Sequence, residues 1–155
     1  MRALSIFWLS LLFQAVAQFE DGTFPVQSNL KAGVAKVDIT PDDVNGMETI
    51  GHVRIVDGVR DPLRAGVLIL DDGETKAAIV TTYLINAYGK MVELARARIE
   101  EKTGVPAANI MVTASHNHSG PKFDPITKYG RTLIDKLGEA ASAAADDMQT
   151  VSIGG

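Results

Sequence analysis

Hydrophobic and polar residues alternate with a period of two early in the chain, a pattern that predicts a half-buried strand. Residues 33–40 alternate apolar side chains such as Val37 with polar ones such as Lys36. The following residues 41–60 are rich in glycine, aspartate and asparagine, which favours a long loop. Within that loop, residues 52–56 fit a short strand.

Longer apolar runs follow the loop. Residues 63–70 and 76–82 are apolar, and the polar segment Asp-Asp-Gly-Glu at 71–74 separates them. These two runs are therefore expected to form a β-hairpin. Residues 109–113 predict a short buried strand, and residues 151–153 look like the start of another strand.

Two segments space their apolar residues three and four apart, as amphipathic helices do. Residues 90–102 carry Met91, Leu94, Ala95 and Ile99 on one side, and a glycine and a proline follow to stop the helix. The second helix is expected to begin at Asp124-Pro125 and to continue to about Asp146. Its apolar face comprises Ile126, Tyr129, Leu133, Leu137, Ala140, Ala141 and Ala144.

This order of elements predicts an α/β layered domain with a mixed β-sheet and packing helices. The sheet is expected to be antiparallel at the hairpin and parallel around the two helices. The last residues read like the opening of an element, so we expect an incomplete part of a larger catalytic domain.

The amino terminus resembles a secretory signal peptide. Met1-Arg2 provides a positive start, residues 3–13 are apolar, and Ala15-Val16-Ala17 fits a cleavage site. An uncleaved anchor or a buried helix is the alternative. The predicted divisions are a signal peptide at 1–17, a flexible segment at 18–30 and the α/β domain at 31–155, with a secreted or periplasmic location and no transmembrane segment in the mature chain.

Charge and cysteine content narrow the possible partners. The formal net charge is −4 and the basic residues are scattered, which argues against nucleic acid as a partner. The chain has no cysteine, so disulfides contribute nothing to its stability even in an oxidising compartment.

The strongest chemical signal follows the predicted strand at 109–113. His116 and His118 are two residues apart, so in an extended backbone both rings would point to the same side. Imidazole is the commonest metal ligand, and a His-x-His pair supplies two of the three or four ligands of a zinc site. The alternative is a pair of solvated or hydrogen-bonded loop histidines.

Residues 116–121, His-Asn-His-Ser-Gly-Pro, resemble the His-Thr-His-Ser-Gly-Pro type motif of the neutral/alkaline non-lysosomal ceramidases. Residues 32–41 are similar to the opening strand of that family, and residues 60–73 to its next strand. Residues 103–110 match as well, so the resemblance covers nearly all of the chain after about residue 30, as the amino-terminal part of the catalytic domain.

The resemblance implies a role for each histidine. His116 corresponds to a zinc ligand, and His118 to a residue beside the metal that helps to stabilise the reacting carbonyl; direct ligation by His118 is the alternative. The substrate implied is ceramide or a related N-acyl lipid at a membrane or micelle surface. The sequence departs from the family at Asn117, where threonine is usual, and at Tyr83, where aspartate is frequent. His52 is a weaker third candidate that we leave out of the ligand set.

Two classes of function remain open at this stage. One is a secreted, zinc-dependent, ceramidase-like amidase that uses metal-activated water. The other is a truncated, inactive relative that serves as a secreted binding or accessory module. The family's remaining ligands, a histidine, a glutamate and a tyrosine, lie far downstream of the motif, so we expect these 155 residues alone to hydrolyse ceramide poorly.

The signal-peptide pattern predicts that the exported protein begins at Gln18. Amino-terminal sequencing or intact-mass measurement of the secreted protein checks this. Recovery of the protein in a membrane pellet with residues 1–17 still attached would contradict it.

Overall fold

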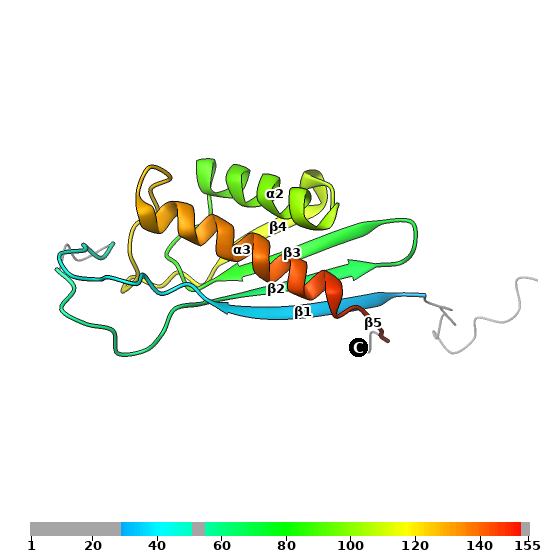
Figure 1. Ribbon diagram of the computed structural model, residues 1–155, viewed down its shortest axis with the longest axis horizontal. Coiled ribbons are helices and arrows are strands. Elements are labelled where there is room, and N and C mark those ends of the chain that lie inside the picture. Colours follow the sequence, from blue (N-terminus) through cyan, green and yellow to red (C-terminus); the bar gives the residue numbers. More distant parts are fainter. Residues whose placement is uncertain (1–28, 51–54, 153–155) are drawn as a thin grey trace, which may run out of the picture.

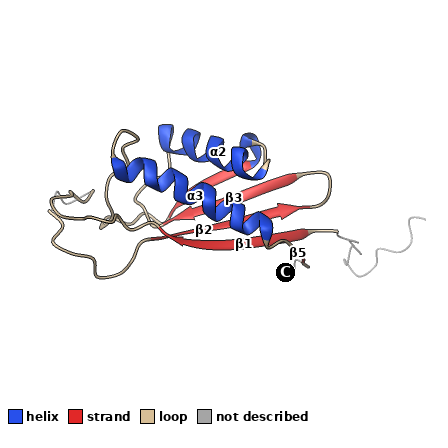
Figure 2. Cartoon of the chain, viewed as in Figure 1, coloured by secondary structure: helices blue, strands red, loops and turns tan. Residues whose placement is uncertain are grey.

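The computed structural model describes residues 29–50 and 55–152. Five strands form a single sheet in the order β4-β3-β2-β1-β5, and both helices lie on one face of it (Figures 1 and 2). The expected α/β architecture with a mixed sheet is confirmed. The elements are β1 (Lys31–Asp38), β2 (Arg64–Asp71), β3 (Lys76–Thr82), α2 (Gly89–Thr103), the 3-10 turn η1 (Ala107–Asn109), β4 (Ile110–Ala114), α3 (Lys128–Asp146) and β5 (Gln149–Thr150).

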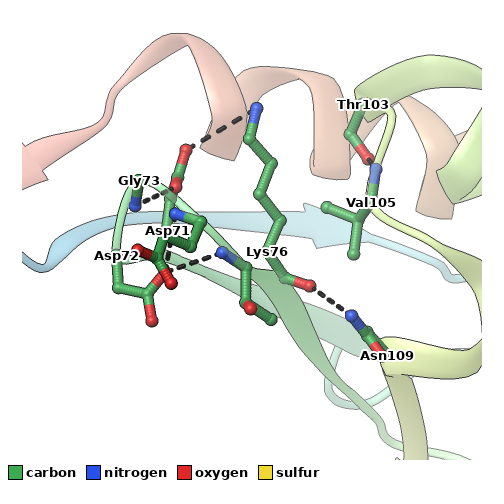
Figure 3. Close-up of polar contacts among 9 residues, drawn as sticks. Asp71, Asp72, Gly73, Lys76, Thr103, Val105 and Asn109 are labelled. Atoms are coloured by element: carbon green, nitrogen blue, oxygen red, sulfur yellow. Dashed lines mark hydrogen bonds and ion pairs between the residues drawn. The ribbon is translucent and has the colours of Figure 1, made fainter.

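The predicted hairpin is present, because β2 and β3 pair antiparallel over their length. In its turn the carboxylate of Asp72 accepts the N–H groups of Glu74 and Thr75 at 2.9 and 2.7 Å. These hydrogen bonds, that from Thr75 most, lower the pKa of Asp72. The side-chain amide of Asn109 donates to the carbonyl oxygen of Lys76 at 3.0 Å and joins this end of the hairpin to the start of β4 (Figure 3).

Strand directions agree with the prediction around α2 but not around α3. β3 and β4 are parallel and α2 connects them. β5 pairs antiparallel with β1, which runs in the same direction as β3 and β4, so the expectation of parallel strands around α3 is wrong. After α3, Asp147 and Met148 carry the chain onward, and Gln149 and Thr150 pair with the first residues of β1. Val151, expected to open a strand, only donates its N–H to Leu30, and residue 153 lies outside the described residues.

The start of α3 also differs from the sequence prediction. The hydroxyl of Thr127 accepts the N–H of Gly130 at 3.0 Å and caps a helix that begins at Lys128. The carboxylate of Asp124 instead accepts the N–H of Ile126 in a turn before the helix. Ile126 is 78% exposed and does not belong to the apolar face of α3. Aspartate followed by proline suits a turn as well as a helix start, which explains the error.

The strand predicted at 33–40 and the helix predicted at 90–102 are confirmed as β1 and α2, and the other local predictions have mixed outcomes. Residues 41–50 and 55–60 form a loop with two isolated bridges, Glu48 to Ile55 and Thr49 to Pro121. Of the strand predicted at 52–56, residues 52–54 lie outside the described residues. β4 is an edge strand, so Met111 is half-exposed although a fully buried strand was expected. Neither helix of the described residues combines the length and hydropathy that a bilayer crossing requires. The predicted signal peptide lies outside the described residues.

The core lies between the sheet and the two helices. The buried face of α3, Leu133, Leu137, Ala140, Ala141 and Ala144, packs on β1 and β2, and α2 contributes Met91, Ala95 and Ile99. Small residues on α3 allow it to approach the sheet closely. At Gly33 in β1 the approach is closest, because a Cβ there would overlap the carbonyl oxygen of Ala144.

This contact predicts a large effect of Gly33→Ala. The added methyl group must displace α3 from β1, so the free energy of unfolding should fall by about 3 kcal/mol. Urea denaturation followed by circular dichroism measures the change. Gly58→Ala is the matched control, because a Cβ at Gly58 meets no atom within 4 Å, and it should stay within about 0.5 kcal/mol of the wild type. Equal stability of the two variants would contradict the close packing.

Candidate functional site

The histidine segment lies at the carboxyl ends of the parallel strands β3 and β4 (Figure 1). Main-chain pairing continues past both strands, since the N–H of Ser115 donates to Thr82 at 2.9 Å and that of Asn117 to Leu84 at 3.1 Å. The segment after β4 is therefore held beside the segment after β3. In α/β sheets, sites commonly occupy this edge.

The carbonyl oxygen of Ile85 orients the ring of His116. It lies 2.9 Å from Nδ1 of that ring. Because a carbonyl oxygen can only accept, Nδ1 carries the hydrogen, and Nε2 of the neutral ring keeps its lone pair for a metal or a donor. Metal-binding histidines are usually held in this way by a second group on the other nitrogen.

His118 brings its own Nε2 atom to the same point. The two Nε2 atoms are 3.3 Å apart, and the rings meet edge to face with centroids 4.8 Å apart. Nitrogen ligands about 2.0–2.1 Å from a tetrahedral zinc ion lie about 3.3–3.4 Å apart. The separation therefore suits either a hydrogen bond between the rings or two positions around one metal ion.

The two rings meet as expected, but the backbone that brings them together is not extended. His116 has φ 63°, in the left-handed region that non-glycine residues seldom adopt. Simple alternation along a strand therefore does not account for the convergence. The bend at His116 and the Ile85 hydrogen bond set the positions of the rings.

Asn117 stabilises the bend between the histidines, a role that the sequence did not reveal. Its side-chain oxygen accepts the N–H of Ser119 at 2.9 Å, and its side-chain nitrogen donates to the carbonyl oxygen of Tyr83 at 3.3 Å. The first bond is an Asx turn, which an asparagine inside a turn segment would have suggested. Tyr83, where the family often has aspartate, contributes its main chain here while its side chain is half-exposed.

Two cavities border the histidine segment and share Pro121 in their walls. The smaller, about 160 Å³, is mainly apolar, with Lys90 and Lys122 as its charged residues. Its apolar wall comprises Ile50, Leu84, Ile85, Tyr88, Met91, Pro121, Phe123 and Pro125. The larger, about 650 Å³, is more polar and includes Asn117, Ser119, Arg60 and Asp61. Ile85 thus lines the apolar cavity and also offers its carbonyl oxygen to the His116 ring.

The described residues supply two donors to this site. Across residues 29–50 and 55–152, no group of three or more histidine, cysteine, aspartate or glutamate side chains is placed to hold a metal ion. His52, the weaker third candidate from the sequence, lies outside the described residues. The two imidazoles are consequently a partial ligand set.

Comparison with known proteins connects this fold to ceramidases. No protein-family model matches the sequence, and no curated protein matches it. The structure is similar to that of neutral ceramidase from Pseudomonas aeruginosa, with a TM-score of 0.70 and 20% identity, over 81% of this chain and 23% of the ceramidase chain. It is also similar to a ceramidase complexed with C2, with a TM-score of 0.68 and 20% identity, over 80% of this chain and 22% of the other.

The chain therefore spans less than a quarter of the length of either ceramidase. The family that the sequence resembles and the structures that the fold resembles are the same, neutral ceramidases. At 20% identity this agreement establishes the fold: the chain has the α/β fold of a part of neutral ceramidase.

Proposed function

We propose that the chain forms part of an exported zinc-dependent amidase that hydrolyses the N-acyl bond of ceramide or a related lipid. The observation that carries the proposal is the 3.3 Å approach of the His116 and His118 Nε2 atoms, with the His116 ring held by Ile85. The ceramidase fold and the ceramidase-like sequence around this pair give independent support.

The donor chemistry of the pair suits zinc, which binds neutral imidazole nitrogen. When bound, zinc polarises an amide carbonyl and lowers the pKa of its water to about 7. In this proposal His116 would hold the ion through Nε2. His118 would donate a hydrogen bond to the oxygen that gains charge as the carbonyl is attacked. Direct ligation by His118 is the competing role, and the distance between the rings accommodates both.

The apolar cavity supports a substrate with a hydrocarbon portion. Its wall includes Ile85, the residue whose carbonyl group fixes the His116 ring. Polar groups of a lipid amide would meet the exposed imidazoles while its apolar part enters the cavity. A small polar amide would leave this apolar surface unused.

The backbone of His116 is a further reason to assign it a function. A left-handed conformation costs a non-glycine residue about 1–2 kcal/mol. Such strain is concentrated at binding and catalytic sites, where a side chain is needed in one position. Glycine would fit this bend without strain. The presence of histidine at a strained position therefore indicates that its imidazole ring is needed there.

The second candidate, a binding or accessory module without catalysis, is favoured by one observation. The described residues bring together two donors, whereas a zinc site needs three or four protein ligands. An amidase of this kind needs the remaining ligands from elsewhere in a longer polypeptide. A module that binds lipid in its apolar cavity does not.

Zinc titration of histidine variants tests the proposed roles. His116→Ala should abolish most of the zinc affinity, because it removes the oriented ligand. His118→Ala should retain much of the affinity but lower lipid-amidase turnover by about 10²-fold or more in a polypeptide that supplies the remaining ligands. Calorimetry measures zinc binding, and release of fatty acid measures turnover.

His52→Ala is the matched control for these variants, with the same chemical change at the third histidine. It should leave zinc affinity unchanged if the site consists of the motif histidines. Equal loss of affinity in the His116 and His118 variants would make His118 a ligand. If neither variant loses zinc affinity, both residues are ordinary loop histidines and the zinc proposal is refuted.

The strained backbone makes a separate prediction about stability. His116→Gly and His116→Ala both lose the imidazole, but only glycine fits φ 63° without strain. The glycine variant should therefore be more stable than the alanine variant by about 1 kcal/mol, as measured by urea denaturation. At Ser119, which has a negative φ, the same pair of substitutions should not favour glycine. A His116→Ala variant as stable as His116→Gly would show that the bend is not strained.

A further inference from the structure

Both helices begin at the end of the molecule where β3 and β4 end (Figure 1), and an exposed hydrophobic residue precedes each helix. Tyr88 immediately precedes α2 and is 68% exposed, and Ile126 lies two residues before α3 and is 78% exposed. Tyr88 and Pro125, the neighbour of Ile126, line the same apolar cavity. Tyr88 and Ile126, the apolar tips, therefore lie beside the same cavity.

Basic side chains surround these tips. Lys90 and Lys122 line the same cavity as Tyr88, and Arg131 lines a shallow hollow that also includes Pro125. The guanidinium group of Arg131 donates to the carbonyl oxygen of Ile126. This concentration of positive charge occurs in a chain whose formal net charge is −4.

Few carboxylates neutralise these cations. Lys90 pairs with Glu93 at 2.9 Å, but within the part of the chain that the structure describes neither Lys122 nor Arg131 forms an ion pair. The nearby Asp124 adds a formal negative charge, and Asp135, which lines the same hollow as Arg131, pairs with Arg98 at 3.0 Å. The three cations Lys90, Lys122 and Arg131 therefore exceed the two carboxylates Glu93 and Asp124 by one formal positive charge.

We propose that this tip surface, made of Tyr88, Lys90, Lys122, Ile126 and Arg131, binds the interface of an anionic phospholipid bilayer. Tyrosine is suited to the boundary between headgroups and hydrocarbon, because its ring is apolar and its hydroxyl is polar. Isoleucine inserts its side chain into the apolar layer, while lysine and arginine attract anionic headgroups. The inference deepens the proposed function, since the lipid amide would be taken from the surface that the protein binds.

Vesicle co-sedimentation tests the tip surface without any measurement of turnover. The probes are vesicles of phosphatidylcholine alone and vesicles that also contain 30% phosphatidylglycerol, with all proteins purified to the same amino terminus. Wild-type protein should bind the anionic vesicles at least about tenfold more tightly than the neutral ones, and added salt should weaken the binding.

Substitutions separate the apolar contribution from the electrostatic one. The double change Tyr88→Ser and Ile126→Ser should weaken binding about tenfold. Tyr88→Ser does not threaten the fold, because serine is a favoured residue at the start of a helix. Lys122→Gln with Arg131→Gln should weaken binding to anionic vesicles by about fivefold for each charge removed. Val34→Ser is the matched control: Val34 is 64% exposed but lies on β1 in the sheet, so binding should not change.

Three results would overturn the proposal. They are no vesicle binding by the wild type, equal binding to neutral and anionic vesicles, and a loss in Val34→Ser as large as that in the serine double variant. The last result would place the lipid contact on the sheet. Zinc affinity is measured separately on the same serine variant and should be unchanged. Failure of vesicle binding would then leave the zinc proposal intact. Failure of zinc binding would leave the proposal of a lipid-binding surface intact.

Discussion

The parallel pairing of β3 with β4 is the constraint on which the site depends. It runs from Ala78 opposite Ile110 to Thr82 opposite Ala114, and main-chain hydrogen bonds extend it to Leu84 and Asn117. The side chains of Thr82 and Thr113 reinforce it by donating to the carbonyl oxygens of Thr113 and Val80 across the pair. Because both strands end at one edge, residues that are 31 to 34 positions apart in sequence meet there. α2 makes the parallel arrangement possible, because it carries the chain from the end of β3 back to the opposite edge of the sheet, where β4 begins.

Packing of the two helices on one face of the sheet completes the scaffold. α3 lies over β1 and β2 and contacts α2, and the absence of a side chain at Gly33 permits its close approach. The helices also determine the surface near the histidines, because both begin at the edge where β3 and β4 end (Figure 1). The first residues of α2 and the loops that precede both helices contribute to the apolar cavity and supply its lysines. The same packing that stabilises the domain thus places apolar and cationic residues at the sheet edge that carries the imidazoles.

The likeness to neutral ceramidases concerns the scaffold and the sheet edge that carries the histidines. The match extends over four-fifths of this chain and less than a quarter of each ceramidase. What the unit contributes is a sheet edge with two oriented imidazoles. Two nitrogen donors bind zinc weakly without further ligands, so the chemistry proposed here depends on groups beyond this pair.

The sequence by itself predicted most of the local elements and the two candidate metal-binding histidines. Apolar periodicity predicted the β2–β3 hairpin and both helices, because the burial pattern of a short segment follows from its own residues. The His-x-His pair and its flanking residues identified the candidate site and the ceramidase resemblance. Tertiary structure decided the antiparallel direction of β5, the exposure of Ile126, the left-handed bend at His116 and the use of the Ile85 carbonyl. The direction of β5, the Ile85 contact and the bend that Asn117 holds against Tyr83 depend on residues far apart in the chain. The exposure of Ile126 depends on a local choice, because an Asp-Pro pair suits a turn as well as a helix start. A main-chain carbonyl group leaves no trace in the residue types.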